Sequence, residues 1–290
     1  MFNDLLIHPS TQTQLKAFAA KPSHALLLIG PSGSGKATLG RQLAAELLKL
    51  PVDKLDGSAS FVWIQRVEGK QDIPIDAVRS LKKQLSLKVP GKNDIRRVVL
   101  LENAHYMNQE AQNAFLKSLE EPPQNTVFIL TTISDIRLLP TVVSRAPAIS
   151  VRPVSLKTAK NYFADKDGLE PAWVLSQGAP ALLASLLSDD EEHELKATVS
   201  RAKEFLGKSR YERLLELNQL TSDKPALDGF LDALGRVTRA LNRASVNKGN
   251  QSLAKRSLKA SQLIAEVRED LQANVSPKLA ALRLATQLSL

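Results

Sequence analysis

The stretch that decides the fold is a short apolar run, residues 25–29, which leads directly into a glycine-rich segment and then a helical pattern. It is His24-Ala25-Leu26-Leu27-Leu28-Ile29-Gly30-Pro31-Ser32-Gly33-Ser34-Gly35-Lys36-Ala37-Thr38. The glycines let the backbone turn its N–H groups toward phosphate oxygens, and the following helix offers its positive end. Lys36 would reach the β and γ phosphates of a nucleotide. The segment therefore predicts a strand, a phosphate-binding loop and a helix, with ATP or ADP as the ligand.

One position in this loop departs from the usual pattern. The residue after Lys36 normally carries a hydroxyl that ligates Mg²⁺, and Ala37 has none. Thr38 cannot simply replace it, because adjacent residues on a helix point about 100° apart. We expect weak nucleotide binding and compromised placement of Mg²⁺.

Around this loop the first half of the chain alternates β-branched runs with helical patterns, which is typical of a parallel α/β sheet. The expected strands are residues 25–29, 61–64, 97–101, 126–131 and 148–151, with amphipathic stretches at 39–48 and 111–119. The strands are mostly continuous apolar runs, as expected for strands that are covered on both faces. The sequence thus predicts a five-stranded α/β domain over residues 1–152.

After Pro153 no strand pattern remains, and the rest is predicted to be all-α. The charge run at 189–192 suggests a boundary between two helical parts, 153–192 and 193–290. Phe230, Leu234, Val237 and Leu241 recur at helical spacing, so one face of their helix should be buried. Ser276-Pro277 is a favourable helix start, and residues 279, 282 and 284 are leucines expected to supply its apolar contacts.

Composition excludes several classes of protein. The chain has 290 residues and no Cys, so disulfides and thiolate zinc sites are excluded, and its four scattered His residues suggest no metal site. No run approaches the roughly 20 apolar residues of a membrane span, and the start lacks signal-peptide features, so we expect a cytoplasmic protein. The net charge of +9 is compatible with a nucleic-acid partner or with solubility alone.

A second acidic element follows the predicted strand at 97–101. Residues 98–105 resemble a Walker B strand and the turn after it, where an active AAA+ ATPase carries an Asp that organises Mg²⁺ and a Glu that activates water. Here Glu102 stands in the metal-side position and Asn103 in the position of the base. An amide cannot accept a proton from water as a carboxylate does. The element therefore predicts loss of ATP hydrolysis.

Four further stretches resemble the clamp-loader family of AAA+ proteins. They are residues 113–123, with a Glu-Glu-Pro-Pro turn; 126–132, similar to the sensor 1 strand; 138–146, similar to a Ser-Arg-Cys element with Ala146 in the Cys position; and 274–279, similar to the final collar helix. The resemblance implies an AAA+ domain, a small helical lid and a helical collar. Because residues 50–60 are short and lack Cys, the zinc module of many relatives is not expected.

The resemblance also assigns roles. Thr132 matches the residue that senses the γ phosphate, and Arg145 matches an arginine finger that acts in a neighbouring subunit's ATP site. Ala181 stands where active subunits carry the sensor 2 arginine. Loss of the metal hydroxyl, the base and sensor 2, with the finger kept, resembles the delta-prime branch rather than the hydrolysing gamma/tau branch.

The resemblance implies a heteropentameric ring with gamma/tau and delta subunits, and a sliding clamp and primed DNA as further partners. Arg79, Lys82 and Lys83, on a helix after Pro74, are the candidate DNA contacts. A basic stretch from Arg236 to Lys259 contains no acid and is either solvated or faces an acidic partner or DNA. An ATP-hydrolysing gamma/tau-like subunit, another AAA+ DNA motor and a small-molecule kinase are the alternatives.

Overall fold

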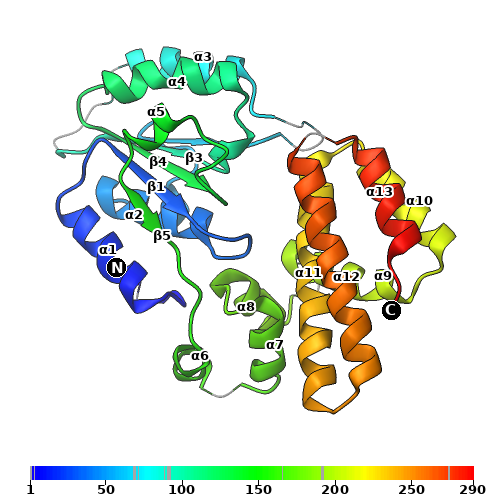
Figure 1. Cartoon of the computed structure of the whole chain (residues 1–290). Coiled ribbons are helices and arrows are strands. Elements are labelled where there is room, and N and C mark those ends of the chain that lie inside the picture. The colour runs from blue at the N-terminus through cyan, green and yellow to red at the C-terminus, as the bar shows by residue number, and fades with distance from the viewer. Residues whose placement is uncertain are drawn as a thin grey trace. The chain divides into compact units, whose positions relative to one another are not determined.

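The computed structural model describes residues 2, 4–67, 70, 72–87, 89, 93–164, 166–190, 193–273 and 275–290. The chain divides into two compact units, Met1–Ser155 and Leu156–Leu290. Most helices and strands of both units are labelled in Figure 1.

The first unit is built on a five-stranded parallel sheet with the order β2-β3-β4-β1-β5. The strands are β1 (Ala25–Ile29), β2 (Phe61–Ile64), β3 (Arg97–Leu101), β4 (Thr126–Thr132) and β5 (Ala148–Ser150). The predicted parallel sheet is confirmed, and each predicted strand lies within one residue of its observed bounds. β1, which precedes the glycine-rich loop, lies between β4 and β5.

Helices cover both faces of this sheet, as Figure 1 shows. They are α1 (Pro9–Ala20), α2 (Lys36–Leu48), α3 (Ile75–Ser86), α4 (Gln109–Glu120) and α5 (Pro140–Val143), with short 3-10 turns η1 (Val52–Lys54) and η2 (Ala104–Tyr106). Leu15 and Leu43 pack with Leu26 on one face, while Phe115 packs edge-to-face on Phe128 on the other, with ring centroids 5.3 Å apart. Successive strand residues point to opposite sides of the sheet, and in the central strands they are apolar on both sides. Both faces therefore need a covering layer of helices.

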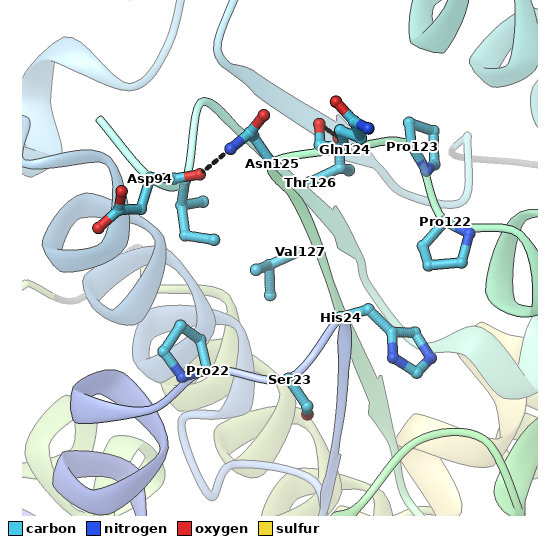
Figure 2. Close-up of a pocket in the computed structure, with 11 residues that line it drawn as sticks. Pro22, Ser23, His24, Asp94, Pro122, Pro123, Gln124, Asn125, Thr126 and Val127 are labelled. Carbon is cyan, nitrogen blue, oxygen red and sulfur yellow. Dashed lines mark hydrogen bonds between the residues drawn. The ribbon is translucent and has the colours of Figure 1, made fainter. Parts of the chain in front are cut away.

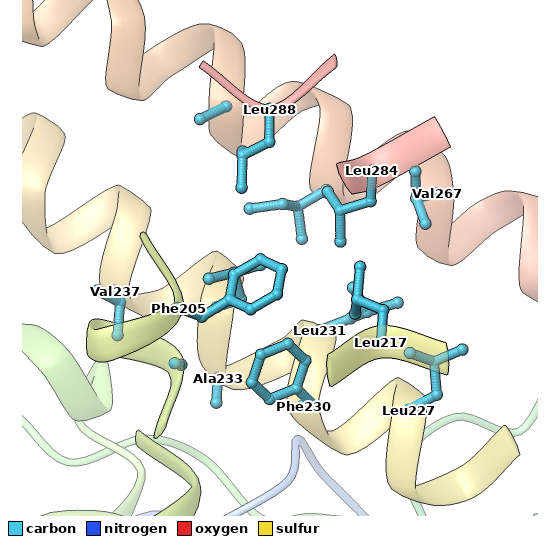
Figure 3. Close-up of a cluster of buried hydrophobic side chains, with 14 of the residues drawn as sticks. Phe205, Leu217, Leu227, Phe230, Leu231, Ala233, Val237, Val267, Leu284 and Leu288 are labelled. Atoms are coloured by element: carbon cyan, nitrogen blue, oxygen red, sulfur yellow. The ribbon is translucent and has the colours of Figure 1, made fainter. Parts of the chain in front are cut away.

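The second unit is all-α in its described residues, as predicted. Its helices are α6 (Leu156–Phe163), α7 (Leu169–Ser176), α8 (Pro180–Leu187), α9 (Glu194–Gly207), α10 (Arg210–Leu220), α11 (Lys224–Asn247), α12 (Gln251–Gln272) and α13 (Pro277–Gln287). Phe205 and Phe230 form the centre of its core, with ring centroids 5.2 Å apart (Figure 3). Helices α11 and α12 form a long antiparallel hairpin, whose turn contains Gly249 at φ +69°.

The structure corrects the expected packing of α13. Leu284 is fully buried, but Leu279 and Leu282 are 61% and 45% exposed, and small residues, Ala280 and Ala281, occupy the buried face instead. Ser276 stands at the N-cap as predicted, although its side chain makes no capping hydrogen bond.

The predicted lid (153–192) and collar (193–290) contribute to one core. Leu175, Ala179 and Leu182 from α7, α8 and the turn between them cluster with Phe205 and Leu234. Of the charge run expected at the boundary, Glu191 and Glu192 lie outside the described residues. The finer division into lid and collar stays a prediction.

Within the described residues, no helix combines the length and the apolar character needed to cross a membrane.

Truncating Phe205 to Ala should lower the free energy of unfolding by about 3–5 kcal/mol, because it leaves a cavity at a fully buried position of the core. Leu279→Ala, at an exposed position of the same unit, should change it by less than about 0.5 kcal/mol. Urea unfolding followed by far-UV circular dichroism measures both. Equal effects of the two substitutions would contradict the packing described here.

Candidate nucleotide site

The glycine-rich loop leaves the sheet at the carboxyl end of β1. Gly33 and Gly35 adopt left-handed φ angles of +74° and +82°, which residues with a side chain rarely adopt. At Gly30 a Cβ atom would lie 2.9 Å from the Val151 carbonyl oxygen and 3.0 Å from Ser34 Oγ, so only glycine fits. The loop has the backbone geometry of a phosphate cradle.

Lys36 lies inside this loop. It is only 7% exposed, and its Nζ donates hydrogen bonds to the carbonyl oxygens of Gly30 and Pro31 at 2.8 and 2.9 Å. Ser34 Oγ is buried beside it without a hydrogen-bond partner among the described residues. A buried ammonium group and a buried hydroxyl in one loop suit a phosphate ligand, because phosphate oxygens accept from both.

The metal side of the site is weaker. Ala37 and Thr38 follow Lys36 on the first turn of α2; Ala37 brings no hydroxyl, and Thr38 is solvent-exposed. Among the described residues no group of three or more His, Cys, Asp or Glu side chains could hold a metal ion. The residues present fit the phosphates of a nucleotide but offer a divalent cation little beyond Glu102.

Glu102 follows β3 and is held by a residue that sequence reasoning missed. The indole Nε1 of Trp63, on the edge strand β2, donates to Glu102 Oε2 at 3.1 Å. The Arg41 guanidinium lies 4.7 Å from the centroid of the Trp63 ring and pairs with Asp56 through two hydrogen bonds of 2.9 and 2.7 Å. Trp63 lies near Glu102 because β2 pairs with β3 in parallel with Ile64 opposite Leu101, a register that depends on strand order rather than on local sequence.

Asn103 and Thr132 also lie at the carboxyl ends of the strands. Asn103 has a left-handed φ of +52°, and its backbone N–H donates to Thr131 Oγ1 at 2.8 Å. Thr132 is fully buried; its hydroxyl donates to the Ser134 carbonyl oxygen at 2.6 Å and lies 3.3 Å from His105 Nδ1. Its own carbonyl oxygen accepts from the Gly30 N–H at 3.1 Å. The structure thus attaches Thr132 to the loop, although its hydroxyl has local partners.

His105 is a second residue of this edge whose chemistry the structure clarifies. Burial lowers its pKa to about 3, and the nearby positive charges of Arg137 and Lys36 act in the same direction. The imidazole is therefore neutral at physiological pH and packs against Tyr106, with ring centroids 4.3 Å apart. These properties are those of a packing residue rather than of a proton donor or acceptor.

The remaining predicted site residues lie outside the loop. Arg145 follows α5; its Nη2 pairs with Glu120 Oε1 at 2.7 Å and its Nη1 donates to the Thr141 carbonyl oxygen at 2.9 Å. Arg79 and Lys83 are exposed on α3, where Lys82 is partly exposed and Arg79 pairs with Asp76 at 3.2 Å. Ala181 lies in the first turn of α8, in the second unit.

A cavity of about 350 Å³ lies at the opposite edge of the sheet, at the amino ends of β1 and β4 (Figure 2). His24, Asp94 and Asn125 are among the residues that line it, and the Asn125 side-chain amide donates to the Asp94 carbonyl oxygen. None of its described lining residues is Lys or Arg, so it lacks the cations that phosphates require. The glycine-rich loop therefore remains the candidate nucleotide site.

Residues 8–155, just over half of the chain, match the family model described as DNA polymerase III, delta subunit. The chain belongs to this family. Its delta-prime subunit relative from Pseudomonas aeruginosa is 34% identical over 202 residues, which cover 62% of this chain and 60% of the relative. The tau subunit of DNA polymerase III from Bacillus subtilis is 24% identical over 216 residues, 69% of this chain and 37% of the relative.

These matches span about three fifths or less of the relatives' own length. They confirm the predicted resemblance to delta-prime subunits of DNA polymerase III. Among solved structures, a DNA polymerase III gamma subunit-related protein from Thermotoga maritima aligns with a TM-score of 0.56 and 19% identity, over 96% of this chain and 97% of that one. This likeness supports the AAA+ fold with an α-helical second half.

The low pKa of His105 predicts a pH-dependent stability. In the unfolded chain its pKa returns to about 6.5, so between pH 6.5 and pH 3 the unfolded state binds more protons and the free energy of unfolding falls as the pH decreases. At pH 5 this loss should be about 2 kcal/mol relative to pH 7. His105→Asn should lack this component, whereas His193→Asn, outside the site, should keep it. Urea unfolding at both pH values measures the difference; parallel losses in all three proteins would refute the assignment.

Proposed function

We propose that this chain is a non-hydrolysing, delta-prime-type subunit of a bacterial DNA polymerase III clamp loader. The proposal rests on Asn103, which follows the carboxyl end of β3 and, by the resemblance of its sequence to active ATPases, would occupy the position of the base that activates water. An amide does not accept that proton. The loop itself retains its phosphate-binding geometry, so binding and hydrolysis are separated in this chain.

Nucleotide binding would rest on residues 30–36. The left-handed glycines and the helix N-terminus would hold phosphates, and Lys36 would exchange its bonds to Gly30 and Pro31 for bonds to phosphate oxygens. ATP or ADP should bind weakly, because that exchange costs two existing hydrogen bonds. Mg²⁺ should add little, since Ala37 has no hydroxyl and Glu102 accepts a hydrogen bond from Trp63. No zinc is expected.

Arg145 would act in trans as an arginine finger. Its side chain is 35% exposed, and its partner Glu120 is 47% exposed, so this ion pair is weak enough to open when an anion approaches. In a ring, the guanidinium would face the γ phosphate held by the neighbouring subunit and stabilise the negative charge that develops during hydrolysis. Thr132 would sense the γ phosphate only if its hydroxyl left Ser134.

The proposed partners follow from the same role. Gamma/tau and delta subunits would complete a heteropentameric ring in the cytoplasm, which loads a sliding clamp onto primed DNA. Arg79, Lys82 and Lys83 would contact the DNA backbone from α3, since they present cations on its solvent side. The weak ion pair of Arg79 with Asp76 leaves its charge available.

A gamma/tau-like ATPase is the second candidate, favoured by the intact geometry of the loop and by the gamma and tau relatives. Ala37, Asn103 and Ala181 weigh against it, because each removes a group that hydrolysis uses.

The isolated chain should hydrolyse ATP far more slowly than about 1 s⁻¹, the lower end of the range of ordinary enzymes, with or without primed DNA. Loss of the base at Asn103 and of the metal hydroxyl at Ala37 is the reason. Steady-state phosphate release measures the rate, with Lys36→Ala as a control for contaminating ATPases. Turnover near 1 s⁻¹ that Lys36→Ala abolishes would favour the gamma/tau-like motor instead.

Arg145→Ala should leave the free energy of unfolding within about 1 kcal/mol of wild type, because it removes one half-exposed ion pair. Reconstituted rings that carry it should lose most of their DNA- and clamp-stimulated ATPase, and Arg145→Lys should not restore it, because an ammonium lacks the planar fork of guanidinium. Glu120→Gln breaks the same ion pair but keeps Arg145, so it is the matched control and should retain activity. Wild-type ATPase in assembled Arg145→Ala rings would exclude the finger.

A further inference from the structure

The positive charge of this chain is concentrated in one hairpin. Residues 233–265, in α11, α12 and their turn, contain seven Lys and Arg and no Asp or Glu, so they account for seven of the nine net positive charges. Elsewhere the chain is nearly neutral. The excess positive charge is therefore a property of this hairpin rather than of the whole protein.

Acidic residues of the hairpin lie only at its other end. Asp228 and Asp232 accept hydrogen bonds from Arg268 at 3.0 and 2.8 Å, and Asp270 accepts from Arg283 at 2.6 Å. Arg236 belongs to this end: against expectation it is buried, and it donates to Asp232 and to the Ser176 carbonyl oxygen. The hairpin thus has one end with neutralised charges and one without.

The turn end carries five exposed cations: Arg243, Lys248, Lys255, Arg256 and Lys259. None of them forms an ion pair with a described residue. Arg243 lies 6.0 Å from the centroid of the Trp173 ring, a contact that orients the guanidinium without neutralising it. Mutual repulsion among these cations is unfavourable unless a polyanion covers them.

We propose that this turn end binds the phosphate backbone of double-stranded nucleic acid. Residues 231–290 contain no aromatic side chain, so stacking on single-stranded bases is not the mode of contact. Three of the five cations are lysines, which are depleted in protein–protein interfaces, whereas lysine and arginine are the usual phosphate contacts. The inference rests on the hairpin alone and not on the proposed role in clamp loading.

The test uses the full chain and a 30-base-pair duplex of arbitrary sequence. A triple variant, Lys248→Gln with Lys255→Gln and Lys259→Gln, should bind about tenfold more weakly than wild type at 50 mM salt. The slope of log affinity against log salt should fall in magnitude by about 2–3, because each lost phosphate contact removes about 0.9. The matched control, Lys157→Gln with Lys203→Gln and Lys278→Gln, removes the same charge from other exposed positions and should bind within about twofold of wild type.

Lysine acetylation of the wild-type protein is a second test that needs no substitution, so misfolding of a variant cannot explain its result. Duplex DNA should protect Lys248, Lys255 and Lys259 from acetylation, while Lys203 and Lys278 stay reactive. Equal weakening in both triple variants, absence of duplex binding at 50 mM salt, or unprotected hairpin lysines would each overturn the proposal. Protection that persists in an Arg79→Gln, Lys82→Gln, Lys83→Gln variant would support it even if the proposed DNA contact on α3 fails.

Discussion

The hydrogen bond from the Gly30 N–H to the Thr132 carbonyl oxygen extends the pairing of β1 and β4 by one residue beyond the end of β1. This hydrogen bond fixes the start of the glycine-rich loop at Gly30, directly after β1. Gly30 is confined there by the Val151 carbonyl oxygen, which excludes a side chain. Because all five strands are parallel, Glu102 and Thr132 reach the same edge as the loop, and the chemistry of the site depends on this alignment.

Much of the first unit could be predicted from sequence because its central strands, β1, β3 and β4, are buried on both faces. Such strands are continuous apolar runs, so their limits in the sequence nearly coincide with their limits in the structure. The loop was equally predictable, since its glycines have a specific backbone purpose. Side-chain partners were not: the bond from Trp63 to Glu102 joins residues 39 positions apart, and only the strand order brings them together.

Helices were harder to predict in detail than strands. Their periodicity indicates that one face is buried, but it does not show which side chains of that face will contact the neighbouring helix. On α13 the packing partner accommodates alanines, and two leucines are left in solvent. Arg236 was expected on a solvated face, yet it is buried. Its hydrogen bonds to Asp232 and to the Ser176 carbonyl oxygen offset the cost of removing its charge from water. Such pairings depend on tertiary contacts and leave little trace in the local sequence.

The contact between Trp63 and Glu102 also has an optical consequence. The chain has two tryptophans, and one of them, Trp63, donates its indole N–H directly to Glu102 while Arg41 lies over its ring. Indole emission is sensitive to hydrogen bonding and to nearby charge. A rearrangement of Glu102 would thus alter the intrinsic fluorescence of the protein, and replacing Trp173 by Phe would leave Trp63 as the single emitter, a label that is already part of the molecule.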